Sequence, residues 1–298
     1  MRDQELFDAF YYAHSCGRPY ARDDEWLRFF GTIAERIRAD LPAFADAGSG
    51  HASAAAIRPP RVLDAGCAMG LLVEALVARG IDAHGLDISE YAIAQAAPAV
   101  AGRCRVGSLT SPLDGRYDLI VCIEVLEHMP PEEARVALAN ICAHTDDVLF
   151  SSSPTDFGES THVNVQPPEA WAEAFAREGF LRDLDYDASF ITAWAVRFRR
   201  RAEPAPRIVR DYERAASRLM IERNELRQQV LQFDRQVQAE AVEAPKLRVQ
   251  LARANEDLLA AQRRVAALDD TVRHMESSLF WRLRQVWTSI RGVFGGRR

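Results

Sequence analysis

The spacing of apolar residues divides the chain into a strand-and-helix region and a long helical region. Residues 61–77 contain an apolar run, a turn with Gly66 and Gly70, and then apolar residues at spacings of three and four. This order predicts a strand, a glycine-bearing loop and the start of a helix. Residues 82–93 repeat it, with a strand that ends at Asp87 and a helix capped by Ser89. The repeat predicts β-α-β units and therefore an α/β fold.

Three more strands are predicted downstream, at residues 103–106, 117–123 and 147–152. The middle run is almost continuously apolar, as expected for a strand that is buried on both faces of a parallel sheet. It leads into Glu124-Val-Leu-Glu-His128, which places polar side chains at the carboxyl edge of the sheet, where α/β proteins bind their ligands.

The segment before the first strand is predicted to be helical at 3–47 and a small, proline-ended linker at 47–60. Asp23 and Asp24 occupy a position typical of helix caps. The tyrosines near the start, at 11, 12 and 20, are expected to pack on the sheet; closing over a bound cofactor is the alternative.

A long helical pattern begins after Glu203-Pro-Ala-Pro206. From Val230, apolar or small residues alternate at spacings of three and four as far as Leu279, and Glu240 is the one exception. Such a repeat predicts a coiled coil and a homo-oligomer, and a long helix packed on its own domain is the alternative. Pro245 conflicts with this pattern, because an internal proline is expected to kink or interrupt a helix.

The last segment, 280–298, combines aromatic and aliphatic residues at helical spacing with five arginines and no acid. That composition is typical of a helix that lies in a membrane interface. A face that packs on a partner chain is the alternative, and the segment is too short and charged to span a bilayer.

Charge and cysteine usage narrow the class of protein. Residues 1–200 carry 18 arginines against 30 acids, whereas residues 201–298 carry 19 basic residues against 13 acids. The acidic part argues against a nucleic-acid partner. The five cysteines form no C-x-x-C pair, which argues against a disulfide framework or a zinc site. With no signal-peptide core at the start, we expect a cytoplasmic protein, with peripheral contact at the inner membrane as the further expectation from the tail.

The glycine loop and Asp87 together suggest a nucleoside cofactor. The loop, Asp64-x-Gly66-x-Ala68-x-Gly70, is neither the dinucleotide fingerprint nor a P-loop. Its glycines allow positive φ angles and a close approach of backbone N–H groups to a ligand. A carboxylate at the end of the next strand is placed to accept both hydroxyls of a ribose, which is also compatible with NAD.

The same loop resembles the first motif of class I S-adenosylmethionine-dependent methyltransferases, (Asp/Glu)-x-Gly-x-Gly-x-Gly, with Ala68 in place of the middle glycine. The resemblance covers residues 10–200 and implies a Rossmann-like sheet flanked by helices, S-adenosyl-L-methionine as the cofactor, and no metal. It implies that Ser108-Leu109 faces the adenine, where the family often has an acid. The cofactor-binding residues that it implies are Asp64, Gly66, Cys67, Ala68, Gly70, Asp87, Ile88, Ser108, Leu109 and Glu124.

Residues 153–180 and an expected strand at 191–196 further resemble methyltransferases of bacterial cell-surface polysaccharide biosynthesis, some of which are fused to glycosyltransferases. The implied partners are a glycan or glycolipid acceptor and a glycosyltransferase. Methyl transfer to a hydroxyl needs a base, and the candidates are His162 and His128. A structural role for each histidine remains open, as does a metal site on the Glu-x-x-Glu-His turn.

The sequence therefore predicts four regions: an N-terminal helical cap and linker (1–60), a methyltransferase core (61–202), a coiled coil (207–279) and a basic amphipathic tail (280–298). The leading function is O-methylation of a surface glycan or its lipid-linked precursor. The alternatives are a small-molecule or lipid methyltransferase, and a non-catalytic scaffold whose coiled coil is the working part.

Overall fold

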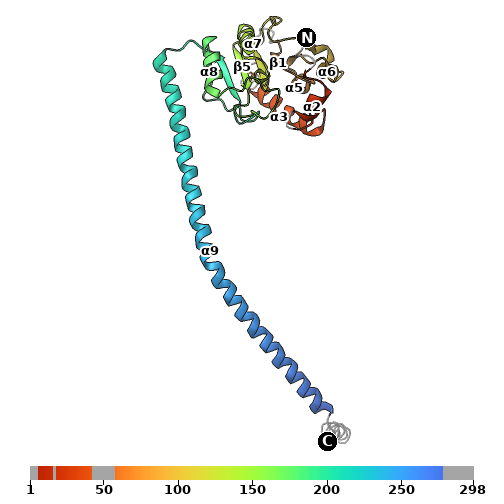
Figure 1. The fold of residues 1–298 in the computed structure, drawn as a ribbon, viewed down its shortest axis with the longest axis vertical. Coiled ribbons are helices and arrows are strands. Elements are labelled where there is room, and N and C mark those ends of the chain that lie inside the picture. Colours follow the sequence, from red (N-terminus) through yellow and green to blue (C-terminus); the bar gives the residue numbers. More distant parts are fainter. Residues whose placement is uncertain (1–5, 16–17, 42–57, 278–298) are drawn as a thin grey trace, which may run out of the picture. The chain divides into compact units, whose positions relative to one another are not determined.

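The protein is described by a computed structural model over residues 6–15, 18–41 and 58–277. The predicted linker and the basic tail fall almost entirely outside these ranges, as does Cys16. Contacts divide the chain into two compact units, 1–215 and 216–298. The first unit holds the sheet and its helices, and the second consists, where described, of most of the long helix α9 (Figure 1).

A seven-stranded sheet forms the centre of the first unit, in the order β3-β2-β1-β4-β5-β7-β6. The first five of these strands run parallel, and β7 is antiparallel to both β5 and β6. The strands are β1 (Arg61–Ala65), β2 (Asp82–Asp87), β3 (Cys104–Val106), β4 (Leu119–Ile123), β5 (Asp147–Ser151), β6 (Phe180–Arg182) and β7 (Val196–Arg200). The five strands expected from the apolar runs are all present, with ends that shift by one or two residues.

Helices cover both faces of this sheet because neighbouring residues of a strand point to opposite sides. Val62 of β1 lies in a core with α3 and α5, whereas Leu63 lies in a second core with α7 and α8. The helices are α2 (Ala9–His14), α3 (Asp24–Asp40), α5 (Leu71–Val77), α6 (Glu90–Ala94), α7 (Pro131–His144), α8 (Pro168–Arg177) and α9 (Ala205–Ser277).

The N-terminal segment forms two helices, α2 and α3, and not the single helix expected at 3–47. Helix α2 is short, and α3 begins at the predicted cap, where the Asp23 carboxylate accepts the N–H groups of Glu25 and Trp26. Helix α3 buries Ile33 and Ile37 in the same core as α5. The N-terminal segment is therefore packed into the first unit.

The prediction of a strand at residues 191–196 is wrong. Residues 191–195 form turns, and β7 begins at Val196 and continues through three arginines. These charges are accommodated because acids lie beside them: Arg197 donates Nε and Nη2 to the Asp147 carboxylate at 2.7 and 2.6 Å. The charged sequence is the reason that an apolar pattern did not indicate this strand.

Helix α9 runs without a break from Ala205 to Ser277, with Pro245 inside it (Figure 1). Of the two predicted effects of Pro245, a kink or an interruption, the interruption is therefore wrong. Proline removes the hydrogen bond to the carbonyl of residue 241, and both residues are exposed, so water can satisfy that carbonyl. None of the described helices is long and apolar enough to cross a membrane.

Candidate cofactor and acceptor site

The glycine loop is held in place by its own backbone. The N–H groups of Gly66 and Cys67 both donate to the Leu86 carbonyl, at 2.8 and 3.2 Å, and the N–H of Gly70 donates to the Cys67 carbonyl at 2.8 Å. The Ala68 N–H donates to Asp87 Oδ2 at 2.7 Å. We expected the loop N–H groups to face a ligand. Three of these four instead fasten the loop to β2, and the Gly70 N–H closes the loop on itself.

Both glycines of the loop are required by their surroundings. Gly66 has φ +85°, and a Cβ there would lie 2.3 Å from Cγ2 of Val125. Gly70 has φ +72°, and its Cβ would lie 2.7 Å from Sγ of Cys104. Ala68 adopts φ 47°, so the small residue that replaces the middle glycine takes the left-handed conformation at some cost in strain.

Asp87 joins the loop to the helix after β2. Its Oδ2 accepts the Ala68 N–H, and its Oδ1 accepts the Ser89 N–H at 2.8 Å. Each carboxylate oxygen keeps a second lone pair that can accept a ligand hydroxyl. Burial raises the pKa of Asp87 even though backbone hydrogen bonds from Ser89, Ala68 and Ile88 favour its charged form. The side chain is thus both a structural link and a candidate ribose ligand.

Asp64 lies at the end of β1 and is 5% exposed. Burial, followed by the charge of Asp87, raises the pKa of Asp64 to about 8. Both causes oppose its charged form, and a cation in the site would favour that form. Two carboxyl groups at adjoining strand ends therefore make a site suited to a ligand that carries positive charge and a ribose.

The other predicted cofactor residues differ in how they are placed. The Cys67 side chain is 3% exposed and lies against Gly85 and Cys104. The Leu109 side chain is 6% exposed in the core, and its carbonyl accepts a hydrogen bond from Asn140. Ser108 Oγ is hydrogen-bonded to Thr110 Oγ1 at 2.7 Å, and Ile88 is partly buried beside Asp87. Adenine contact by Ser108 and Leu109 stays a prediction.

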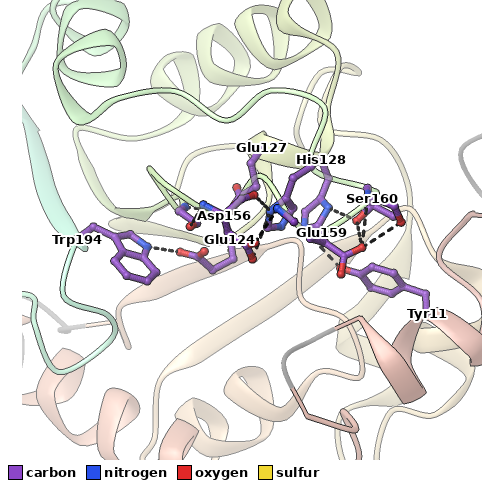
Figure 2. Close-up of polar contacts among 12 residues, drawn as sticks. Tyr11, Glu124, Glu127, His128, Asp156, Glu159, Ser160 and Trp194 are labelled. Atoms are coloured by element: carbon purple, nitrogen blue, oxygen red, sulfur yellow. Dashed lines mark hydrogen bonds and ion pairs between the residues drawn. The ribbon is translucent and has the colours of Figure 1, made fainter.

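Glu124 connects three parts of the site. It has φ 52°, and its Oε1 accepts hydrogen bonds from Ser151 Oγ at 2.5 Å and from Trp194 Nε1 at 2.8 Å. Figure 2 shows the Trp194 indole directed at this carboxylate. Such contacts explain how a strained residue persists. They fix the loop after β4 against β5 and against the turn before β7.

Glu127 is fully buried beside Glu124. Burial, followed by the charge of Glu124, raises the pKa of Glu127 to about 8. Its Oε1 accepts the Ser153 N–H at 3.2 Å, and its buried Oε2 accepts no hydrogen bond within the described residues. In its protonated form Glu127 can donate a hydrogen bond from Oε2 toward Glu124.

His128 is engaged at both ring nitrogens. Nδ1 lies 2.9 Å from Thr161 Oγ1, and Nε2 lies 3.4 Å from the Tyr11 hydroxyl. Because Thr161 donates its own proton to Glu159 at 3.2 Å, its oxygen accepts the Nδ1 proton of His128. Burial lowers the pKa of His128 to about 4. This histidine is therefore neutral and holds the loops together.

His162 has one nitrogen left for chemistry. Its Nδ1 lies 2.8 Å from the Asp156 carbonyl oxygen, which can only accept, so Nδ1 carries the proton and Nε2 carries the lone pair. Asp156 Oδ2 lies 3.7 Å from the same Nδ1. The side chain is 9% exposed, and its ring centroid is 4.6 Å from that of His128.

Residues of the N-terminal segment pack against His128 and the glycine loop, a contact that the sequence analysis did not predict. Phe7 and Tyr11 pack edge-on against His128, and the Phe7 carbonyl accepts a 2.6 Å hydrogen bond from Ser89 Oγ. Tyr12 is buried with Met69 of the glycine loop. Tyr11 and Tyr12 thus pack on the glycine loop and on His128, and not on the sheet as expected. Within the described residues, no group of three or more His, Cys, Asp or Glu is placed to hold a metal ion.

A family model for a methyltransferase domain matches residues 32–181, half of the chain. The chain belongs to the methyltransferase domain family. S-adenosyl-L-methionine is the cofactor of this methyltransferase. The site fits that molecule on its own evidence, because two buried carboxyl groups of raised pKa suit a ligand with a sulfonium, an ammonium and a ribose.

Named relatives match only part of the methyltransferase. A ubiquinone biosynthesis O-methyltransferase of Alkalilimnicola ehrlichii is 32% identical over 101 residues, 31% of this chain and 41% of the relative. A magnesium-protoporphyrin O-methyltransferase of Synechocystis is 30% identical over 105 residues, 33% of this chain and 46% of the relative. The chain spans less than half the length of these curated relatives.

Among solved structures, magnesium protoporphyrin IX methyltransferase from Synechocystis with bound S-adenosylmethionine is similar at 19% identity and a TM-score of 0.49. The match covers 67% of this chain and 98% of that one.

Proposed function

We propose that this methyltransferase transfers the methyl group of S-adenosylmethionine to a hydroxyl of its acceptor, with His162 as the base. When bound, the sulfonium supplies an activated methyl group. The acceptor oxygen forms the new C–O bond, the C–S bond breaks, and the hydroxyl proton goes to His162 Nε2. S-adenosylhomocysteine and a protonated histidine result.

One observation carries this assignment. The Asp156 carbonyl fixes the His162 proton on Nδ1, which leaves the Nε2 lone pair free for a substrate proton. The Asp156 carboxylate also lies 3.7 Å from Nδ1 of His162. His128 has both nitrogens engaged and a pKa lowered to about 4, so it suits a positioning role better than that of the base.

For the acceptor, we propose a surface glycan or its lipid-linked precursor, on the resemblance of residues 153–180 to polysaccharide methyltransferases. A small-molecule hydroxyl is the second candidate. It is favoured by the relatives named as ubiquinone biosynthesis O-methyltransferases. A purified-protein assay with labelled S-adenosylmethionine, offered cell-surface glycan intermediates in one arm and catechol-type quinone precursors in the other, separates the two.

The base is tested with His162→Ala, His128→Ala and the control His84→Ala, which alters a histidine paired with Asp82 away from this loop. We expect kcat to fall by about 10²–10⁴-fold for His162→Ala at unchanged cofactor affinity. His84→Ala should behave as the unaltered protein. A normal kcat for His162→Ala, or activity that disappears with a chelator and returns with a divalent cation, would contradict proton transfer to His162.

A further inference from the structure

Helix α9 exposes a continuous apolar seam. Every residue from 217 to 275 is exposed, including nine large apolar side chains at spacings of three, four or their sums. These side chains are between 51% and 65% exposed. They are Val230, Phe233, Val237, Leu247, Leu251, Leu258, Val265, Leu268 and Val272. Nothing in the described part of the chain covers them, and such a seam needs a partner to be stable.

Part of the seam has residues that favour a two-stranded parallel coil. Written as heptads abcdefg, the a positions are Val230, Val237, Ala244, Leu251, Leu258, Val265 and Val272, and the d positions are Phe233, Glu240, Leu247, Ala254, Ala261 and Leu268. Valine occupies four of these seven a positions, and β-branched residues at a with leucine at d favour parallel dimers. The pattern extends for more than six heptads, about 70 Å of helix at 1.5 Å per residue.

Charges beside the seam suit a second copy of the same chain. In a parallel, in-register dimer, a residue at g faces the residue at e five positions later in the partner. Glu243 at g then faces Arg248 at e, and Arg264 at g faces Asp269 at e. Each pair occurs twice in the dimer by symmetry. No g–e pair between Gln229 and Asp269 brings like charges together.

Pro245 and Glu240, the two residues that depart from the heptad pattern, are both compatible with a parallel, in-register dimer. Pro245 follows the a position Ala244 and so lies at b, on the side of the helix away from the seam. Glu240 lies at d, where it would face its own copy, and this is the one repulsive contact along the seam. A polar residue at a single core position typically sets register at a cost in stability.

We propose that α9 forms a parallel, in-register two-stranded coiled coil with α9 of a second copy of this chain. The partner is identified by the self-complementary g and e charges and by the valine-rich a positions. Both methyltransferase units then precede the same end of the coil.

The charge pairs are tested in the full-length protein by sedimentation and light scattering. The unaltered chain should have twice the 33.4 kDa chain mass. Glu243→Arg brings arginines together twice per dimer and should weaken dimerisation roughly tenfold. Adding Arg248→Glu should restore it. Arg253→Glu, at the outer c position, is the control and should have little effect. A monomer, a trimer, or no rescue by the double variant would overturn the proposal.

Orientation is tested by disulfide formation in a Cys16→Ser background, where the four remaining cysteines are buried. Val230→Cys and Val272→Cys, each alone, should cross-link to their own copy, because an in-register parallel seam brings identical a positions together. Arg253→Cys should not. An antiparallel seam would instead bring a positions against d positions. Cross-linking only in a mixture of the Val230→Cys and Leu268→Cys proteins would therefore show an antiparallel pair and refute the parallel one.

Discussion

Replacing Asp64 tests whether the buried carboxyl at the end of β1 serves a cationic ligand. Burial and the charge of Asp87 raise the pKa of Asp64 from 3.8 to about 8. The folded protein therefore holds a proton there at neutral pH that the unfolded chain has released. The contribution of Asp64 to the free energy of unfolding therefore falls as pH rises from about 4 to about 8. Asp64→Asn should accordingly raise the melting temperature at pH 7 without ligand.

The ligand should reverse that pKa shift. If bound S-adenosylmethionine returns Asp64 to its charged form, then binding at pH 7 releases about 0.9 proton, because a group with a pKa of 8 is about 90% protonated there. The apparent affinity should then rise about 50-fold between pH 6 and pH 8 and level off above that.

Calorimetric titration in buffers of different ionisation enthalpy measures the released proton directly. Asp64→Asn should bind more weakly, with no proton released from this position and a flatter pH profile. Glu127→Gln is the matched control, because it removes the other carboxyl whose pKa is raised to about 8 and should leave the proton release at Asp64 unchanged. Proton release in Asp64→Asn equal to that of the unaltered chain would refute the reasoning.

Three further perturbations test the loop, the ribose ligand and the domain boundary. Gly66→Ala should destabilise the protein by about 2–5 kcal/mol in urea unfolding, through positive-φ strain and overlap with Val125. Gly80→Ala, with φ +79° and open space around it, should cost only the strain; equal losses would contradict the packing argument. Asp87→Asn should weaken S-adenosylmethionine binding by about 2–3 kcal/mol, whereas Asp82→Asn on the same strand should not; equal affinities would remove the ribose assignment. Deleting 207–298 should leave a folded monomer that binds S-adenosylmethionine, and light scattering that still shows a dimer would contradict this.

The strand that the sequence predicted most clearly is the one whose residues are all apolar, β4. Leu119–Ile123 is buried on both faces, so its period and composition agree with its structure. Strand β7 did not follow this rule, since its arginines are neutralised by Asp146, Asp147 and Asp183, which are distant in the sequence. Local patterning carries no signal for such long-range ion pairs.

The residues of the site likewise divide into those that the sequence predicted and those that it did not. The glycine loop and Asp87 were predictable, because spacing within one β-α-β unit fixes where they lie. The difference between His162 and His128 was not. It depends on Asp156, Thr161 and Tyr11, which are brought together only by the folded chain. Likewise, Trp194 reaches Glu124 across 70 positions, and no short-range motif indicates this contact.

The most direct test of the central claim is calorimetric binding of S-adenosylmethionine and S-adenosylhomocysteine to the purified full-length protein. A methyltransferase built on this site should bind either ligand at one site per chain, with each ligand displacing the other. The absence of saturable binding by a folded, unaltered chain would contradict the account and would favour a scaffold in which the methyltransferase fold no longer holds its cofactor.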